Sequence, residues 1–203
     1  MCIRDSPRSL RAVTAALLLA AAGGAPAAEP APPFTLTDAR GESVSLSDFR
    51  GRYVVLEWTN HQCPFVRKHY ESGNMQSQQA FARERGIAWL SIISSAPGTQ
   101  GHVSGARAIR IAEQSGASPR HILLDPDGEV GRAYGARTTP HMYIIDPDGK
   151  LIYQGGIDSI PSADPADIPR ATQYVQVAMT QVLDGQPVAT RSSRPYGCSV
   201  KYD

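Results

Sequence analysis

The sequence predicts one α/β domain, a three-layer sandwich of helices around a mixed central β-sheet. Three observations lead to this fold class. Short apolar runs typical of strands alternate with segments of helical pattern. A late pair of strands around a tight turn adds an antiparallel unit to the alternating order. The 203 residues are 41% hydrophobic and 19% charged, the composition of one globular domain with short extensions.

The first half of the domain shows a hairpin, a strand, a broken helix and a second strand. Apolar residues alternate on both sides of a turn at 38–41, which predicts an N-terminal hairpin extension. The runs 53–59 and 87–94 are apolar at successive positions and predict buried strands. Between them, residues 64–70 predict a helix that breaks near Gly73 before a second helical piece begins.

The second half supplies the remaining elements and an irregular tail. Gly116 ends a helix that begins at Ser104 or Gly105. The tail from Gly185 to Asp203 contains Gly, Pro and Ser and shows no clear period. The other predicted elements are, in order, a strand at 122–124, a helical turn at 129–134, hairpin strands at 141–146 and 150–154, and a helix at 171–183.

Composition excludes several classes of function. With 20 basic and 19 acidic residues the net charge is +1, so no nucleic-acid partner is indicated. Three cysteines are too few for a disulfide framework. After removal of the N-terminal segment described next, no apolar stretch is long enough for a stable membrane span. No cofactor motif is present.

The N-terminus has the pattern of a secretory signal. Arg8 and Arg11 precede a short apolar run, and Ala25-Pro26-Ala27 satisfies the small-x-small cleavage rule. The alternative, a buried N-terminal helix, conflicts with the prolines that follow at once. We therefore expect a signal peptide at 1–27 and an exported, periplasmic protein. The predicted mature chain comprises a linker at 28–33, a domain at 34–184 and a tail at 185–203 that carries Cys198.

Cys63 stands at a strand-to-helix junction and is the leading candidate for chemistry. Pro64 follows it at the first helical position, which makes Cys63 the N-cap. The amides of Phe65 and Val66 and the helix dipole then favour the thiolate, so the pKa of Cys63 should be lowered and the sulfur accessible. The alternative is a buried and inert cysteine.

These segments resemble thioredoxin-fold redoxins of the alkyl-hydroperoxide-reductase/thiol-specific-antioxidant type. The resemblance spans about residues 33–183 and rests on FTLTDARGESVSLSDFRG, YVVLEWT, CPFVRK and TTPHMYIID with DPDGKLIYQGG. More narrowly, NHQCPFV is similar to the NHCPYV-type segment of a peroxiredoxin-like subgroup. The resemblance implies a thioredoxin-like sandwich and thiol chemistry at Cys63.

Two family patterns are incomplete. The second cysteine of a thioredoxin-type Cys-x-x-Cys motif would fall at Val66, so that local disulfide cannot form. The peroxidatic cysteine of a peroxiredoxin would also align with Val66, while Cys63 aligns with the threonine of that motif. The resemblance therefore favours thiol–disulfide exchange over peroxide reduction.

The resemblance assigns roles to further residues. Glu57 lies where thioredoxins hold a buried acid that accepts a proton, and a carboxyl there should have a raised pKa. The alternatives are that Glu57 faces a polar edge or pairs with Lys68. Pro140 matches the cis-proline that faces the reactive cysteine. With Pro64 and Thr139 it would form the surface that binds an extended substrate peptide, paired to the Thr139 backbone.

Cys198, in RPYGCSVKYD, is the second cysteine of the predicted mature chain. It has three possible roles: a resolving cysteine that closes a reversible bond with Cys63, a permanent structural bridge to Cys63, or a free or intermolecular thiol. A flexible tail can bring distant sulfurs together because closing a long loop costs little more than closing a short one. The residues alone do not choose among these roles.

The histidines raise a metal hypothesis that we do not adopt. His61, His69 and His141 are expected near Cys63, but copper carriers of this fold use two closely spaced cysteines and this chain has one there. We interpret His61 and His69 as polar surface residues, Trp58 and Trp89 as core, and Arg107 and Arg110 as a solvated helix face.

The function predicted from the sequence is thiol–disulfide exchange outside the cytoplasm with a protein thiol or disulfide partner. The alternatives are a thiol-dependent peroxidase acting on a small peroxide and a non-catalytic binding module with a structural disulfide.

We predict export with cleavage after Ala27, because a basic segment, a short apolar run and an Ala-x-Ala site follow one another. N-terminal sequencing of the exported protein should begin at Ala28. A soluble exported form that retains residues 10–22 would contradict the prediction.

Overall fold

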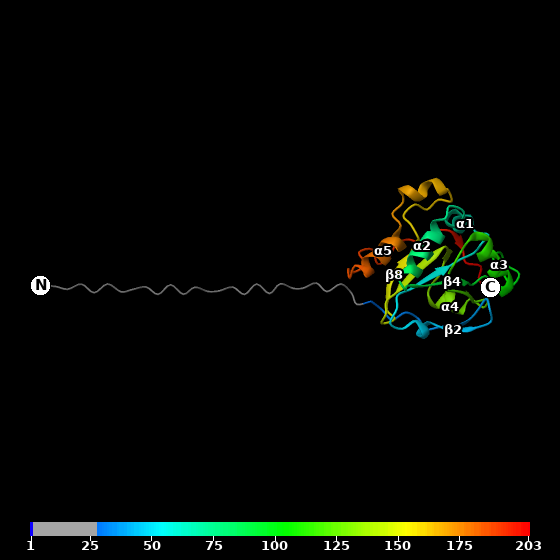
Figure 1. Cartoon of the computed structure of the whole chain (residues 1–203), viewed down its shortest axis with the longest axis horizontal. Helices are drawn as coiled ribbons and strands as arrows, with labels where there is room; N and C mark the ends of the chain where they lie inside the picture. Colours follow the sequence, from blue (N-terminus) through cyan, green and yellow to red (C-terminus); the bar gives the residue numbers. More distant parts are fainter. Residues whose placement is uncertain (2–27) are drawn as a thin grey trace.

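The computed structural model describes Met1 and residues 28–203. The predicted signal segment, apart from Met1, lies outside the described residues. The described chain folds into helices packed on both faces of one large sheet (Figure 1).

The central sheet has seven strands in the order β2-β1-β5-β4-β3-β7-β8. The middle strands β3, β4 and β5 are parallel, and the remaining pairs are antiparallel, which confirms the predicted mixed sheet. The N-terminal hairpin extends this sheet at one edge through β1 and β5. The strands are β1 (Thr35–Asp38), β2 (Ser43–Ser45), β3 (Val54–Trp58), β4 (Ala88–Ile93), β5 (His121–Leu124), β7 (His141–Ile145) and β8 (Leu151–Gly155).

The helices occupy two layers. Helices α1 (Pro64–Glu71), α2 (Asn74–Glu84), α3 (Gly105–Ser115) and α5 (Tyr174–Leu183) lie on one face of the sheet. The opposite face is covered by α4 (Glu129–Ala133) and by the N-terminal segment with its 3-10 helix η1 (Leu46–Phe49). A second 3-10 helix, η2 (Pro165–Arg170), precedes α5. None of the helices in the described ranges is long and apolar enough to cross a membrane.

The core consists of two apolar clusters separated by the sheet. Alternating residues of the buried strands point to opposite faces, so Val55 packs against α2 and α5 while Leu56 packs toward α4. Trp58 and Trp89 are both buried, one in each cluster, as the sequence predicted. The strand β3 thus ends between two packed layers, and the loop that follows it leads to Cys63.

The C-terminal tail follows a defined path across the domain. Its residues 191–193 run parallel to the end of β8, where the Gln154 N–H donates to the Arg191 carbonyl at 3.1 Å. Beyond Cys198, the Ala96 N–H donates to the Lys201 carbonyl at 2.8 Å. The tail is therefore fixed before and after Cys198, an arrangement that no periodic pattern in its sequence indicates.

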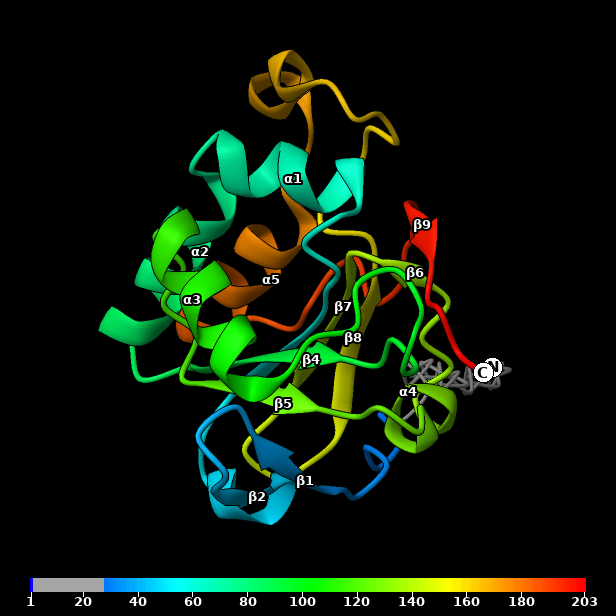
Figure 2. The ribbon, with the colours of Figure 1, turned by 90° about the vertical axis from the view of Figure 1, so that its right-hand side faces the viewer.

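A second, two-stranded sheet joins the tail to the domain. Strand β9 (Cys198–Ser199) pairs antiparallel with β6 (Thr138–Thr139), with Cys198 opposite Thr139. Figure 2 shows β9, in red, beside β6. Cys63 precedes α1, so the β3–α1 junction, the β6–β7 connection and the tail supply the groups of the candidate site.

Candidate active site

Cys63 occupies the N-cap of α1, as predicted, with extended backbone angles and Pro64 at the first helical position. Its carbonyl accepts the N–H groups of Val66 at 3.0 Å and Arg67 at 2.9 Å, which closes the first turn. Its own N–H donates to the Asn60 carbonyl at 3.0 Å. The side chain is fully buried, so the expectation of an accessible sulfur is wrong. The tail and the β6–β7 connection cover it.

The sulfur of Cys63 meets groups from both strands of the small sheet. Its thiol donates to the Thr139 carbonyl at 3.1 Å, and it accepts the backbone N–H of Cys198 at 3.4 Å. The Cys198 thiol also hydrogen-bonds to it. The two sulfurs of the predicted mature chain are therefore neighbours, and both are thiols in this structure.

The pKa of Cys63 lies below the ordinary value of a thiol. Burial alone would raise it, but hydrogen bonds from the thiol and the backbone N–H of Cys198 outweigh burial. The contact with the Thr139 carbonyl instead favours a higher pKa of Cys63, since a carbonyl can accept only from the protonated thiol. The sulfur forms no capping hydrogen bond with the α1 amides. Tail donors, more than the helix start, therefore stabilise the thiolate.

Cys198 has the opposite character. Burial and the neighbouring Cys63 sulfur raise its pKa to about 11, while Lys201 lowers it slightly. A thiol next to a thiolate keeps its proton because it serves as the donor and because a second negative charge nearby is unfavourable. Cys63 is thus the more acidic thiol of the pair, and Cys198 is the proton-bearing partner.

The Thr139–Pro140 peptide bond is cis, as the resemblance implied for Pro140. It presents the Thr139 carbonyl to Cys63 and the Thr139 backbone to a neighbouring strand. That neighbour is β9 of the same chain. The backbone edge expected to pair with a substrate peptide is therefore occupied by the tail.

Gly197 permits this close approach. Its φ is +134°, a backbone conformation that favours glycine, and a Cβ there would overlap the Thr139 carbonyl. The residue before Cys198 must therefore lack a side chain for β9 to lie against β6.

Glu57 is buried in β3 and faces the α1 side of the sheet. Its carboxylate accepts hydrogen bonds from the Tyr70 hydroxyl at 2.8 Å, the Trp89 indole N–H at 2.9 Å and the Ser91 hydroxyl at 2.9 Å. Neither alternative for Glu57 holds, because it faces no polar edge and Lys68 pairs elsewhere. Its role as a proton acceptor for the cysteines stays a prediction.

Four polar side chains that the sequence analysis did not associate with one another form a group between α1, the segment after β8 and the tail. Lys68, His69 and Asp158 are almost fully buried, and the Tyr196 hydroxyl reaches into the group. The interpretation of His69 as a surface residue is therefore wrong, because α1 turns it inward. One signal was available: Tyr196 stands two residues before Cys198 in the tail.

The other histidines do not gather around Cys63. His141 is buried in β7, where burial lowers its pKa to about 4, and its Nδ1 contacts the Tyr143 hydroxyl at 3.1 Å. Within residues 28–203, the cluster with metal-ligand spacing is Asp38, Glu42 and His121, in and around the N-terminal hairpin. No ligand set for a metal forms at the cysteines in that part of the chain.

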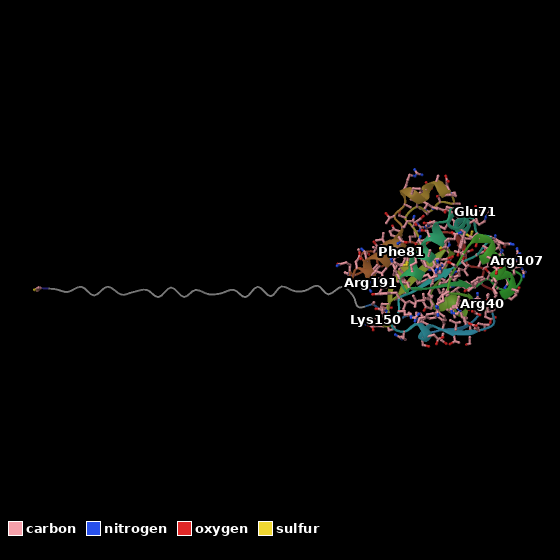
Figure 3. All side chains as sticks on the ribbon, viewed as in Figure 1. Arg40, Glu71, Phe81, Arg107, Lys150 and Arg191 are labelled. Atoms are coloured by element: carbon pink, nitrogen blue, oxygen red, sulfur yellow. The ribbon has the colours of Figure 1, made fainter. Side chains whose placement is uncertain are left out.

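A cavity of about 370 Å³ lies between α1, α3 and the sheet, next to the site. Val66 and Tyr70 line it from α1, and His61 lines it from the loop before α1. Arg107, also at this cavity, is exposed on α3, which confirms the prediction of a solvated helix face (Figure 3). Cys63 itself does not line this space.

Comparison with known proteins agrees with this geometry. Residues 27–154 match the AhpC/TSA family. The chain belongs to the AhpC/TSA family. The redoxin resemblance and the thioredoxin-like sandwich that it implied are thereby confirmed. In this AhpC/TSA protein the matched segment ends before the tail, so Cys198 lies outside the family match.

Individual relatives of this AhpC/TSA protein carry two kinds of name. The thiol-disulfide oxidoreductase ResA of Bacillus thuringiensis is 25% identical over 124 residues, which are 61% of this chain. The match spans 66% of the ResA protein, just under two thirds of its length. A Mycobacterium tuberculosis protein predicted to be a peroxiredoxin is 30% identical over 137 residues, covering 60% of this chain and 79% of its own.

A solved structure extends the likeness to nearly the whole chain. An uncharacterised conserved protein from Geobacillus kaustophilus superposes with a TM-score of 0.72 at 28% identity. The superposition covers 88% of this chain and 93% of that one.

We predict that Gly197→Ala loosens the tail from β6, because the new Cβ overlaps the Thr139 carbonyl. Labelling of Cys63 by a bulky maleimide, followed by peptide mass, should accelerate at least about tenfold. This is the effect expected when the closed position of the tail is destabilised by about 1.4 kcal/mol relative to the open one.

Gly185→Ala is the matched control for that variant. Gly185 also lies in the tail and has a positive φ of 69°, but nothing lies within 4 Å of an added Cβ. It should label Cys63 at the parental rate. Equal rates in the two variants would show that the approach of Gly197 to Thr139 does not hold the tail.

We predict that Cys198→Ala raises the pKa of Cys63, because the thiol that donates to the Cys63 thiolate is lost while the backbone N–H remains. A hydrogen bond to a charged group contributes about 1.5 kcal/mol or more, which corresponds to a rise of roughly one pH unit. The ultraviolet absorbance of the thiolate, followed against pH, measures this midpoint without requiring access to the buried sulfur.

Cys198→Ser keeps a hydroxyl donor at the same place and should shift that midpoint less. An unchanged midpoint in Cys198→Ala would show that the tail thiol does not stabilise the Cys63 thiolate.

Proposed function

We propose that this protein is a thiol–disulfide oxidoreductase in which Cys63 attacks and Cys198 resolves. One observation carries the proposal: β9 places the Cys198 N–H 3.4 Å from the Cys63 sulfur. Cys198 can thus take the part of the second cysteine of a Cys-x-x-Cys motif, which this chain lacks. The ResA relatives, whose names state the same activity, support it. The substrate is a protein disulfide or thiol.

In the first step the Cys63 thiolate attacks a partner disulfide. The bond between the two partner sulfurs breaks, a bond forms between Cys63 and one of them, and the other leaves as a thiolate. The lowered pKa of Cys63 raises the fraction of the sulfur that is thiolate and ready to attack.

In the second step Cys198 attacks the Cys63 sulfur of this mixed disulfide. The Cys63–Cys198 bond forms, and the second partner sulfur leaves as a thiolate. Two electrons have then passed from the two cysteines to the partner, and the two thiol protons go to solvent or to the released thiols. An external thiol reduces the pair for the next cycle.

Electrostatics order these two steps. Before reaction, the Cys63 sulfur helps to hold the pKa of Cys198 at about 11. Once Cys63 is bonded to a partner sulfur, its negative charge is gone, and Lys201 remains as a cation that lowers the Cys198 pKa. Cys198 therefore becomes a better nucleophile only after Cys63 has reacted.

The peptide-binding role of Pro64, Thr139 and Pro140 belongs to this proposal. A substrate strand pairs with the Thr139 backbone only when β9 has left it, because an edge accepts one partner at a time. Attack on a protein disulfide thus requires the tail to open locally. We propose Glu57, which is buried in β3, as the proton acceptor during the exchange.

We propose export to the periplasm as the setting for this chemistry. The signal pattern at 10–28 supports it, and an oxidising compartment is where such a cysteine pair cycles through its disulfide form.

We predict that the two cysteine variants fail differently with a disulfide-bonded protein substrate. Cys63→Ser should abolish turnover because the nucleophile is lost. Cys198→Ser should attack once and accumulate as a mixed disulfide at Cys63, because no internal thiol displaces the bound partner. Non-reducing electrophoresis and peptide mapping detect the adduct, and in the oxidised parent they should show the Cys63–Cys198 crosslink.

A structural bridge gives a different pattern, in which both variants lose stability alike and the bond resists reduction by glutathione. Full turnover by Cys198→Ser would contradict the resolving role. The Cys2→Ser variant serves as the control, because Cys2 lies within the predicted signal peptide.

A peroxidase is the second candidate, favoured by the complete burial of Cys63 and by the mycobacterial relative. A small peroxide reaches a closed site more easily than a peptide does. The Cys63 thiolate would attack one peroxide oxygen and become a sulfenic acid, while the O–O bond breaks and the other oxygen leaves, protonated, as water or an alcohol. The Cys198 thiol would then attack the sulfenic sulfur, form the Cys63–Cys198 disulfide and release the sulfenic oxygen as water. Peroxide consumption faster than protein-disulfide reduction, with sulfenic acid trapped in Cys198→Ser, would select this activity.

A further inference from the structure

The tail before Cys198 is attached to the helix that carries Cys63 at its start. Tyr196 packs its ring edge-to-face on Phe65 of α1, with ring centroids 5.8 Å apart. The Lys68 ammonium lies 5.6 Å from the centre of the same ring. One aromatic side chain of the tail therefore rests on the first two turns of α1, and Cys198 follows two residues later.

A buried ion pair lies beneath that ring. The Lys68 ammonium is 3.2 Å from one Asp158 oxygen and donates also to the Ile160 carbonyl at 3.2 Å. Both charged side chains are closed off from solvent. The pair therefore links α1 to the segment after β8, next to the path of the tail. Burying two charges is expensive, and they remain favourable only when further hydrogen bonds satisfy them.

The Tyr196 hydroxyl completes this network. It donates to the second Asp158 oxygen at 2.5 Å and lies 3.2 Å from His69 Nε2. The Asn74 amide nitrogen lies 2.8 Å from His69 Nδ1, and an amide NH₂ only donates, so the ring proton is on Nε2 and points to Tyr196. The Tyr196 hydroxyl therefore donates one hydrogen bond, to Asp158, and accepts one, from His69 Nε2–H.

Protonation is settled by the same environment. Burial lowers the pKa of His69 to about 4, so the ring is neutral near pH 7. Burial and the bond to Asp158 raise the pKa of Tyr196, which keeps its proton. Lys68 and Asp158 then balance each other, and the group as a whole is electrically neutral.

We propose that Lys68, His69, Asp158 and Tyr196, here called the Tyr196 cluster, are positioning residues that place Cys198 for attack on Cys63. The proposal rests on the resolving role of Cys198 proposed above. Tyr196 is locked to α1, Gly197 passes over Thr139, and Cys198 reaches the sulfur at the N-cap of the same helix. By holding the tail in place, the cluster keeps the Cys198 sulfur near Cys63 and raises its effective concentration there.

The test is the glutathione equilibrium of the Cys63–Cys198 disulfide in Tyr196→Phe. This substitution keeps the ring on Phe65 and removes only the hydroxyl. We expect the equilibrium constant for forming the disulfide to fall about tenfold, which for a two-electron couple makes the potential about 30 mV less negative. The rate at which Cys63 attacks an aromatic disulfide reagent, measured in the Cys198→Ser background, should stay within about twofold of its value with Tyr196 present.

Two further variants make the outcome decisive. Tyr134→Phe also deletes a tyrosine hydroxyl, one that donates to the Pro32 carbonyl at 2.7 Å on the opposite face, and it should leave the equilibrium unchanged. Phe65→Leu removes the ring contact from a half-exposed side chain and should shift the equilibrium in the same direction by less. It serves in place of Tyr196→Phe should that variant fail to fold.

The results separate this inference from the proposed function. An unchanged equilibrium in Tyr196→Phe, in a protein whose Cys63 still attacks disulfides, overturns the positioning role alone. A parent protein that forms no Cys63–Cys198 disulfide overturns both. Loss of thermal stability with an unchanged potential would show that the cluster only stabilises the fold.

Discussion

Strands β6 and β9 pair backbone to backbone, and the chemistry of the site follows from that pairing. It sets Cys198 opposite Thr139, and in this register the N–H and the thiol of Cys198 both face the Cys63 sulfur. A buried thiolate without donors would be strongly disfavoured, because burial penalises the charged form. The tail therefore hides the sulfur from solvent and also supplies the hydrogen bonds that allow it to ionise there.

This dual role links reactivity to tail position. When β9 lies on β6, Cys63 has its donors, but the Thr139 edge that we propose for substrate pairing is occupied. When β9 opens, the edge is free but the Cys198 donors leave with it. A substrate strand that pairs with Thr139 would bring its own backbone N–H groups to the same place, so binding can replace the hydrogen bonds that opening removes. In the proposed function, tail and substrate are therefore alternative partners of one edge.

The two buried carboxylates near α1 are satisfied in different ways, and the difference suits their positions. Glu57 sits inside the sheet layer and accepts only neutral donors, from Tyr70, Trp89 and Ser91. Asp158 lies at the junction of α1, the segment after β8 and the tail, and it has a cationic partner in Lys68 as well as the Tyr196 hydroxyl. An ion pair that needs a third group to be complete ties that group in place, since its removal leaves buried charge unsatisfied. Tyr196 is that third group.

Local pattern was enough to predict much of the fold and one half of the site. Period and turn residues identify the strands and helices, because hydrophobic alternation and glycine stops act over a few residues. The N-cap position of Cys63 ahead of Pro64 is equally local. The place of Pro140 came from the family resemblance, and the structure has that bond in the cis form.

The other half of the site was decided only by tertiary structure. Cys198 is 135 residues from Cys63 in a tail with no period, and no local rule says which strand edge such a tail will choose. The burial of His69 and the pairing of Lys68 with Asp158 likewise depend on which face of α1 meets the segment after β8. The sequence by itself determined that Cys63 would begin a helix at the end of a buried strand. Long-range backbone pairing decided that the Cys63 sulfur is covered, hydrogen-bonded and next to a second sulfur. Such hydrogen bonds between distant segments exist only once the chain has folded.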